Sequence, residues 1–309
     1  MSDPAAEDPA DDDDASTDAA DDDDSAPLPP IPRAWGTWVW DESEFGAGAL
    51  AEDDAVFERE LAAMVGAGIG RAYISWSSRS VDDPTLIASR NAALRASGIE
   101  PSLLLSDNDW ILRSFRGELL SAVEQRVLAF HAGLDDPAGR FAAVHLDLEP
   151  HGRADWSDGS VRQRELLAEL KTTFEAVGEL LAADPDVALE ADLAVWFDAL
   201  PPPNGSSTVG WASAADRDGW FQAVAAVLDQ PTMMAYERDS AQSAWNAVSF
   251  EAERMPVRVA LEAWLGADGT WADLPELLDA AEALEDLAGR DAVDLHSWRR
   301  LREAGLGAD

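Results

Sequence analysis

Residues 141–151 read FAAVHLDLEPH, in which apolar and polar residues alternate from Val144 to Glu149. Side chains two positions apart on a β-strand share one face, so His145, Asp147 and Glu149 point one way and the apolar residues between them point the other. Three neighbouring polar groups on the inner face of a buried strand are costly unless they have a function. The alternation therefore predicts a strand over residues 141–148 with an apolar face under helices and a polar face toward an active site.

Seven more runs with strand character flank this one, and stretches with apolar residues at helical spacing separate them. The predicted strands are residues 34–40, 71–76, 101–105, 141–148, 187–196, 232–236, 257–262 and 292–298. Strict alternation of eight strands with helices predicts an α/β fold, a single (β/α)8 TIM barrel over residues 34–309. A doubly wound open sheet is the competing architecture, but no GxGxxG or phosphate-binding loop follows any of these strands.

Acidic residues dominate the chain, which has 61 Asp and Glu against 22 Lys and Arg and a net charge of −39. Residues 1–33 hold 12 of these acids and several prolines, a composition that cannot bury enough surface to fold, so we predict a disordered acidic tail. Residues 34–309 keep 49 acids against 21 bases, which indicates adaptation to molar salt, where screening weakens self-repulsion. A GC-rich genome is the alternative source of such a composition.

Charge and residue usage also limit the partners and the location of the protein. A strongly negative field repels phosphate, so we expect neither nucleic acid nor an anionic membrane as a partner. No apolar run is long enough for a membrane span, and the N-terminus lacks the basic and apolar regions of a signal peptide, which predicts a cytoplasmic location. The absence of cysteine excludes disulfides and thiolate metal sites. We expect no cofactor, and the sequence predicts no oligomeric state.

The active site of a barrel lies at the C-terminal ends of its strands, where this chain has many carboxylates and tryptophans. Hydrolysis of a glycoside needs one protonated carboxyl and one ionised partner, and Glu149 and Glu262 form one candidate pair. Alternatively, Glu262 is an ordinary rim carboxylate that pairs with an arginine such as Arg238. Flat Trp rings stack on sugar rings, so the expected partner is a carbohydrate substrate. The residues predicted to bind it are Trp38, Trp76, His145, Asp192, Trp196, Arg238, His296 and Trp298.

The fourth predicted strand also resembles a family motif. The stretch AAVHLDLEP, with Asp147-Leu148-Glu149, resembles the DxxDxDxE motif of family 18 glycoside hydrolases, which are chitinase-like barrels. Residues 234–237, MAYE, are similar to the MxYD of that family's sixth strand, and Ser297-Trp298 lies near the place of its Trp on the eighth. Ala142 and His145 stand where the motif has its two earlier aspartates, and MAYE ends in Glu instead of Asp or Asn.

This resemblance implies a role for each matching residue. It implies Glu149 as the general acid, Asp147 as its partner and the group that orients an acetamido substituent, Tyr236 as a transition-state hydrogen-bond donor and Trp298 as a sugar platform. The chain also resembles a little-characterised group of bacterial barrels with HLDxEP on the fourth strand. A third similarity is to the large retaining clan of barrel glycosidases, in which the acid follows the fourth strand and the nucleophile, here Glu262, ends the seventh.

Two other classes of function remain open on the sequence alone. A metal-dependent hydrolase would use His145, Asp147, Glu149 and His296, because an H-x-D-x-E strand presents three nitrogen and oxygen ligands on one face. A non-catalytic carbohydrate-binding barrel is the other alternative, since a fold does not establish a function.

Overall fold

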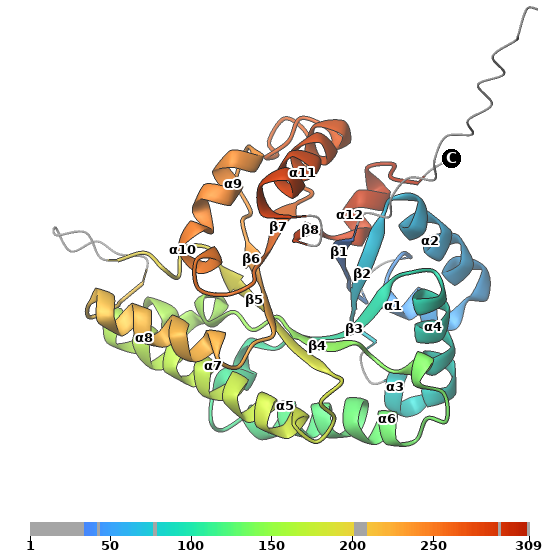
Figure 1. Ribbon diagram of the computed structural model, residues 1–309, viewed down its shortest axis with the longest axis horizontal. Coiled ribbons are helices and arrows are strands. Elements are labelled where there is room, and N and C mark those ends of the chain that lie inside the picture. The colour runs from blue at the N-terminus through green and yellow to red at the C-terminus, as the bar shows by residue number, and fades with distance from the viewer. Residues whose placement is uncertain (1–33, 42–43, 77–78, 201–208, 290–291, 308–309) are drawn as a thin grey trace, which may run out of the picture. The chain divides into compact units, whose positions relative to one another are not determined.

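The computed structural model describes residues 34–41, 44–76, 79–200, 209–289 and 292–307. Eight parallel strands pair in chain order and β8 closes on β1, which confirms the predicted barrel (Figure 1). The strands are β1 (Trp35–Val39), β2 (Ile69–Ile74), β3 (Glu100–Leu105), β4 (Ala143–Leu146), β5 (Ala188–Ala194), β6 (Gln230–Met234), β7 (Arg258–Glu262) and β8 (Val293–His296). The predicted acidic tail, residues 1–33, lies outside the described residues.

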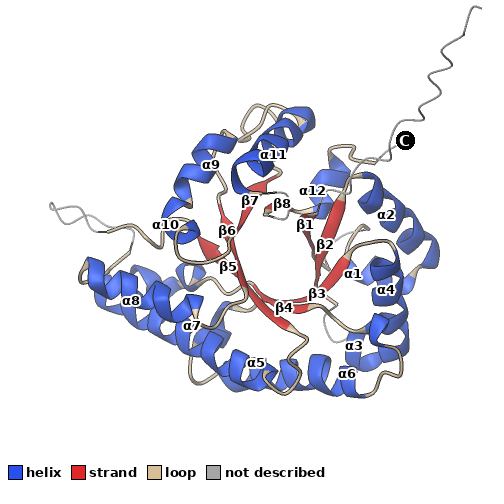
Figure 2. Ribbon diagram, viewed as in Figure 1, coloured by secondary structure: helices blue, strands red, loops and turns tan. Residues whose placement is uncertain are grey.

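Helices follow the strands along the chain and surround them (Figure 2). They are α1 (Ala47–Glu52), α2 (Asp54–Gly66), α3 (Arg79–Asp82), α4 (Pro84–Ala96), α5 (Arg116–Val123), α6 (Phe130–Ala132), α7 (Ser160–Leu181), α8 (Ala214–Ala225), α9 (Ala241–Ala247), α10 (Ser249–Ala252), α11 (Leu274–Ala288) and α12 (Trp298–Glu303). A π-helical turn, residues 124–129, joins α5 to α6. In the described part of the chain, no helix is both long enough and apolar enough to cross a bilayer.

Local sequence signals set the bounds of the helices. The side chains of Asp53 and Asp83 accept hydrogen bonds from free backbone N–H groups at the starts of α2 and α4, and Pro84 occupies the first turn of α4. After these two helices the backbone turns at Gly68, with φ 76°, and at Gly98, with φ 80°. Both angles lie in the left-handed region, where a side chain would be strained, so glycine ends the helix and starts the next strand.

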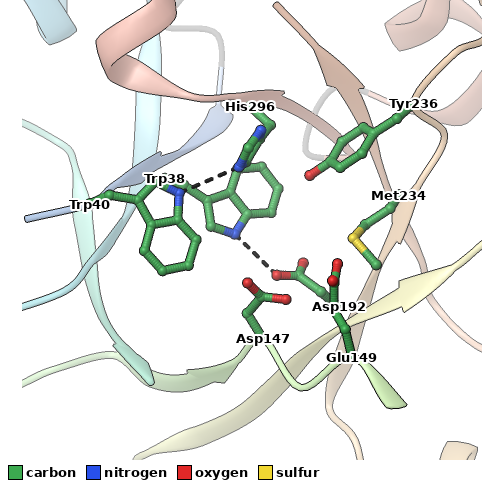
Figure 3. Close-up of a pocket in the computed structure, with 8 residues that line it drawn as sticks. All are labelled: Trp38, Trp40, Asp147, Glu149, Asp192, Met234, Tyr236 and His296. Atoms are coloured by element: carbon green, nitrogen blue, oxygen red, sulfur yellow. Dashed lines mark hydrogen bonds between the residues drawn. The ribbon is translucent and has the colours of Figure 1, made fainter. Parts of the chain in front are cut away.

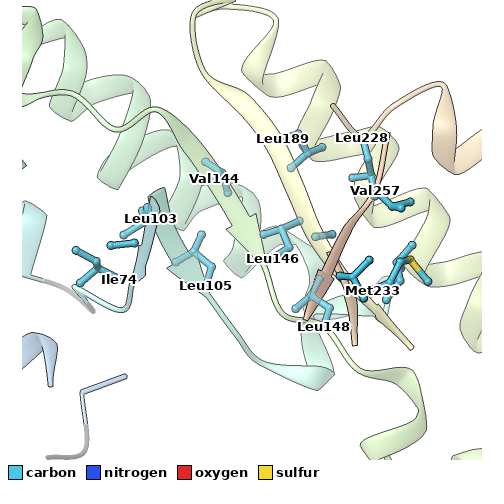
Figure 4. Close-up of a cluster of buried hydrophobic side chains, with 14 of the residues drawn as sticks. Ile74, Leu103, Leu105, Val144, Leu146, Leu148, Leu189, Leu228, Met233 and Val257 are labelled. Carbon is cyan, nitrogen blue, oxygen red and sulfur yellow. The ribbon is translucent and has the colours of Figure 1, made fainter. Parts of the chain in front are cut away.

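The main core lies between the barrel and its helices. Val144, Leu146 and Leu148 are buried on the outer side of β4, against the apolar residues of neighbouring strands (Figure 4). His145 belongs to the opposite face, is fully buried and lies inside the barrel. The predicted alternation along the fourth strand is therefore confirmed. It places the polar residues of this stretch on the barrel axis, where the active site of such a fold is found.

Five predicted strands are longer than the strands in the structure, and three of them exceed these by three or more residues. The stretch 141–148 forms a strand only over Ala143–Leu146, and the stretch 187–196 only over Ala188–Ala194. The stretch 292–298 ends as a strand at His296, because α12 begins at Trp298. Beyond β4 the alternation continues through Asp147 and Glu149, but beyond β8 it stops, and this decides where Trp298 lies.

Candidate active site

A cavity of about 350 Å³ opens at the C-terminal ends of the strands. Three carboxyl groups approach one another on one side of it, and aromatic rings form the other side (Figure 3). The residues that line it are Trp38, Trp40, Asp147, Glu149, Asp192, Met234, Tyr236 and His296. The cavity therefore collects residues from β1, β4, β5, β6 and β8 and from the loops that follow them.

The loops after β3 and β4 hold the first two carboxylates. The backbone N–H of Asp147 still donates to the Leu105 carbonyl, at 3.0 Å, so Asp147 continues the line of β4. The backbone N–H of Glu149 donates to the Asn108 side-chain oxygen at 2.6 Å. At Gly152 an added Cβ would lie 2.7 Å from the Asn108 amide nitrogen, so glycine at this position leaves room for Asn108. Asn108 is thus a positioning residue that fixes the backbone of Glu149.

His145 lies beneath the carboxylates and is fully buried. Its Nδ1 is 3.3 Å from Glu190 and its Nε2 is 3.1 Å from Asp192, while its ring stacks on Tyr73 at 3.9 Å between centroids. Burial alone would lower the pKa of His145, but the negative charges of Asp192 and Glu190 raise it to about 10. His145 is therefore an imidazolium at neutral pH, and it compensates part of the negative charge below the cavity.

The three carboxyl groups of the cavity favour the protonated state. Burial, followed by the charges of Asp192 and Glu149, raises the pKa of Asp147 well above its ordinary value. Burial and then Asp192 raise the pKa of Glu149. The pKa of Asp192 is also raised by burial, although His145 and a hydrogen bond from Trp38 Nε1, 3.1 Å long, oppose the shift. Burial and like charge thus both oppose ionisation of this group.

Neutral aromatic groups complete the cavity. Trp40 Nε1 donates to His296 Nε2 at 3.3 Å, and the rings of Tyr236 and His296 lie 5.2 Å apart. Burial and then the charge of Arg300 lower the pKa of His296 to about 4, so this imidazole is uncharged at neutral pH. Burial raises the pKa of Tyr236 well above its ordinary value, and the nearby carboxylates add to the shift. The Tyr236 hydroxyl therefore keeps its proton and acts as a hydrogen-bond donor.

Buried ionic groups fill the barrel below the cavity. Arg258 Nε donates to Asp294 at 2.8 Å, and Asp294 also accepts from the hydroxyls of Tyr73 at 3.1 Å and Thr232 at 3.2 Å. All four side chains are almost completely buried. A Cβ at Gly36 would lie 1.9 Å from the Asp294 carboxylate, so only glycine leaves space for it. The cavity thus has a packed floor.

Two predicted sugar platforms are corrected by the structure. Trp298 is fully buried, and its Nε1 donates to Glu60 at 3.0 Å, away from the cavity. Trp298 begins α12, so its ring does not share the face of His296. Trp76 follows the end of β2 and is also fully buried in the core outside the barrel. Neither ring can stack on a sugar in this structure.

Three other predicted residues, Glu262, Arg238 and Trp196, do not line the cavity. Glu262 pairs in register with His296, and its carboxylate accepts from Arg300 at 2.9 Å. Glu262 therefore has an arginine partner, as the alternative interpretation expected, but the partner is Arg300. Arg238 lies in the turn after β6. Trp196, beyond the end of β5, packs its half-buried ring 5.0 Å from that of His151.

Sequence reasoning did not identify several residues that shape the site, although a signal was present. Glu190 and Asp192 are two positions apart on β5, as Asp294 and His296 are on β8, so each pair shares a face. Acidic residues at this spacing in an otherwise apolar strand of a closed barrel point inward. The same test applied to every strand would have placed Glu190 and Asp294 inside.

The metal-dependent alternative gains no support from the geometry. Among the residues that the structure describes, no three His, Asp or Glu side chains are arranged to hold a metal ion. His145 and His296, two of the four proposed ligands, instead face carboxylates and aromatic rings.

Comparison with known proteins relates the chain to others by its fold. No protein-family profile matches the sequence, and no curated protein matches it. A chitinase from Bacteroides thetaiotaomicron superposes with a TM-score of 0.53 and 10% identity over 87% of this chain and 91% of that chain. A chitinase from Chromobacterium violaceum superposes with a TM-score of 0.52 and 11% identity over 88% and 98%. A β-mannanase from the blue mussel Mytilus edulis superposes with 0.50 and 12% over 88% and 90%. The chain therefore has the (β/α)8 barrel fold that these chitinases and this mannanase share.

Proposed function

We propose that the protein is a glycoside hydrolase and that Glu149 is its general acid. One observation carries the proposal: Asp147, Glu149 and Asp192 face one cavity at the C-terminal ends of the strands, and all three have raised pKa values. A carboxyl group whose pKa is raised keeps its proton to higher pH, which favours acid catalysis of glycoside cleavage. Fold similarity to chitinases and a mannanase agrees with this chemistry.

The chemistry follows from the positions of these groups. Glu149 donates its proton to the glycosidic oxygen, which leaves with the electron pair of the broken C–O bond. Water adds to the anomeric carbon and loses a proton to a carboxylate, for which Asp147 is our first choice because it lines the cavity and Glu262 does not. The Tyr236 hydroxyl donates to the sugar, and the exposed face of Trp40 contacts the ring.

The test is a panel of chromogenic aryl glycosides and unactivated oligosaccharides, assayed at molar salt. Glu149→Gln keeps the shape of the side chain and removes the proton, so we expect an activity loss of about 10²- to 10⁴-fold. Glycosides with good leaving groups need less protonation and should lose less. Glu58→Gln, an exposed position on α2, makes the same chemical change far from the site and should leave activity unchanged.

Two results would contradict the proposal. Full activity of Glu149→Gln on an unactivated glycoside would remove Glu149 from the mechanism. Binding of an oligosaccharide by calorimetry, with no hydrolysis of any member of the panel, would favour the non-catalytic carbohydrate-binding barrel.

A further inference from the structure

The polar part of the cavity wall consists mainly of hydrogen-bond acceptors. Three carboxyl groups line it, and among the described residues no Arg or Lys side chain does. Met234 is apolar, and the Nε1 hydrogens of Trp38 and Trp40 already donate to Asp192 and His296. The Tyr236 hydroxyl is a donor across the cavity, so a ligand that contacts the carboxyl groups must bring its own donors to them.

Some of these acceptors have no hydrogen bond within the described part of the protein. Oδ1 of Asp147 and Oδ1 of Asp192 are both buried and accept none. Asp192 is only 3% exposed, and its Oδ1 contacts the His145 imidazolium at 3.1 Å as an ion pair, so Oδ1 of Asp147 is the oxygen with neither kind of partner. A buried acceptor without a donor is costly, so Asp147 Oδ1 marks a place where a ligand would donate.

The charge of the cavity is also incompletely compensated. Of the nearby histidines, His296 and His151 are neutral, because burial lowers the pKa of each to about 4. His145 supplies one positive charge from below, and Arg300 is already bonded to Glu262. One imidazolium therefore faces the carboxyls of the cavity, and a cationic ligand would complete the balance.

We propose that the sugar residue bound beside Asp147 and Asp192 carries a protonated amine, so that the substrate class is an amino sugar. This inference rests on the proposed function and names the substrate of the same site. An ammonium group brings three donors and a positive charge to the carboxyl groups of the cavity. An acetamido group brings one donor, no charge and a carbonyl oxygen that would face carboxylates, while a uronic acid would be repelled.

The aromatic wall suits the same ligand. Tyr236 and Trp40 lie across the cavity from the carboxyl groups (Figure 3). Their rings offer flat surfaces for the C–H face of a pyranose, and aromatic faces also attract a nearby ammonium. The carboxylates and the rings would thus hold opposite parts of one amino sugar.

The experiment uses three trisaccharides with the same ring and β-1,4 linkage that differ only at carbon 2: amine, acetamide or hydroxyl. Dissociation constants are measured by calorimetry and kcat/KM from product release, at about pH 6.5, below the ordinary range of an amine pKa. We expect the amino trisaccharide to bind at least about tenfold more tightly than the other two, as one charge-assisted hydrogen bond would give. The preference should shrink at lower pH, as the carboxylates become protonated.

Matched variants separate the site from the general charge of the protein. Asp192→Asn removes one acceptor charge from the cavity and should reduce the preference for the amine about tenfold. Asp186→Asn changes the net charge equally, but at an exposed position before β5, at the opposite end of the barrel, and should leave the preference intact. If Asp192→Asn does not fold, Asp147→Asn is used instead, and we expect the same loss of preference for the amino trisaccharide.

The binding and cleavage results test the amino-sugar inference and the proposed hydrolase function separately. The amino-sugar inference is overturned if the three sugars bind equally, if the acetylated sugar binds more tightly or if no sugar binds. It is also overturned if the two Asp variants have equal effects on the preference. Hydrolysis of the acetylated or unsubstituted trisaccharide would still support the proposed function. Preferred binding of the amino trisaccharide with no cleavage of any sugar keeps the inference and removes the proposed function.

Discussion

Replacing His145 by Gln tests how the barrel tolerates its buried charges. The imidazolium lies 3.3 Å from Glu190 and 3.1 Å from Asp192, and all three side chains are buried. Removing one partner of a buried ion pair costs about 3–5 kcal/mol of unfolding free energy, because the other charge stays buried without compensation. Arg71 also contacts Glu190 and keeps part of the compensation, so we expect the lower end of this range.

The stabilisation that His145 provides depends on pH. A rise in the pKa of His145 from 6.5 to about 10 corresponds to at most about 5 kcal/mol of stabilisation. Because the folded pKa lies above the unfolded one, the contribution is complete below about pH 6.5 and disappears as the pH rises to about 10. His145→Gln should therefore be much less stable than the wild type near neutral pH and nearly equal to it in alkali.

Urea unfolding followed by tryptophan fluorescence measures the unfolding free energy of the wild type and of His145→Gln, at about pH 6.5 and about pH 10. His131→Gln is the matched control, since His131 is also a buried histidine in contact with an aspartate, but burial lowers its pKa. The loss of unfolding free energy caused by His131→Gln should be the same at these two pH values. A cost for His145→Gln below about 1 kcal/mol, or one equal at the two pH values, would refute the assignment of a buried imidazolium.

Four further predictions concern other parts of the chain. Glu262→Gln should lower kcat by much less than the about 10²-fold of an acid–base residue, and near-complete loss in the glycoside assay would make Glu262 the nucleophile. Trp298→Ala should cost about 3–5 kcal/mol in urea unfolding, because the ring is fully buried; a cost under about 1 kcal/mol contradicts this packing. Burial and then Asp198 raise the pKa of Glu251 to about 8, above its unfolded value, so ionisation destabilises the fold. Glu251→Gln should then raise the thermal midpoint at about pH 9 and not at about pH 5, and an equal shift at both would exclude this cause. Deleting residues 1–33 should leave cooperative unfolding unchanged by calorimetry, and its loss would assign them a place in the fold.

The sequence predicts the barrel well because the pattern that forms it is local. Alternation of Val144, His145 and Leu146 follows from the geometry of a single strand, and the pairing order of the strands follows from their order in the chain. The same alternation locates Asp147 at the mouth of the barrel. Each of these inferences needs only the identity of nearby residues and the closure of the sheet.

Residues just beyond a strand are harder to predict. The period of two places His296 and Trp298 on one face only if the strand continues, but β8 ends at His296 and α12 starts two residues later. Trp76 is misplaced for a different reason: it lies two residues after Ile74, whose side chain is in the outer core, so the period of two already directs Trp76 away from the barrel axis. Where a strand ends depends on contacts with the neighbouring elements, and these are not visible in a short stretch of sequence.

The partners of buried charges are also set by the fold as a whole. Arg258 and Asp294 lie 36 positions apart in the chain, and His145 and Glu190 lie 45 apart. Their residue types and spacing indicate which face they occupy, but only the register between β7 and β8, or between β4 and β5, brings each pair together.

The packed floor formed by Arg258, Asp294, Tyr73 and Thr232 has a consequence for turnover. Since these buried side chains fill the barrel under the cavity, a substrate and its product must both pass at the C-terminal end of the barrel. The product therefore leaves at the same end of the barrel at which the next substrate enters, so the two compete for access to the cavity. Under the proposed function, the released sugar should therefore be a competitive inhibitor, and the pace of its departure would limit how fast the enzyme works on concentrated substrate.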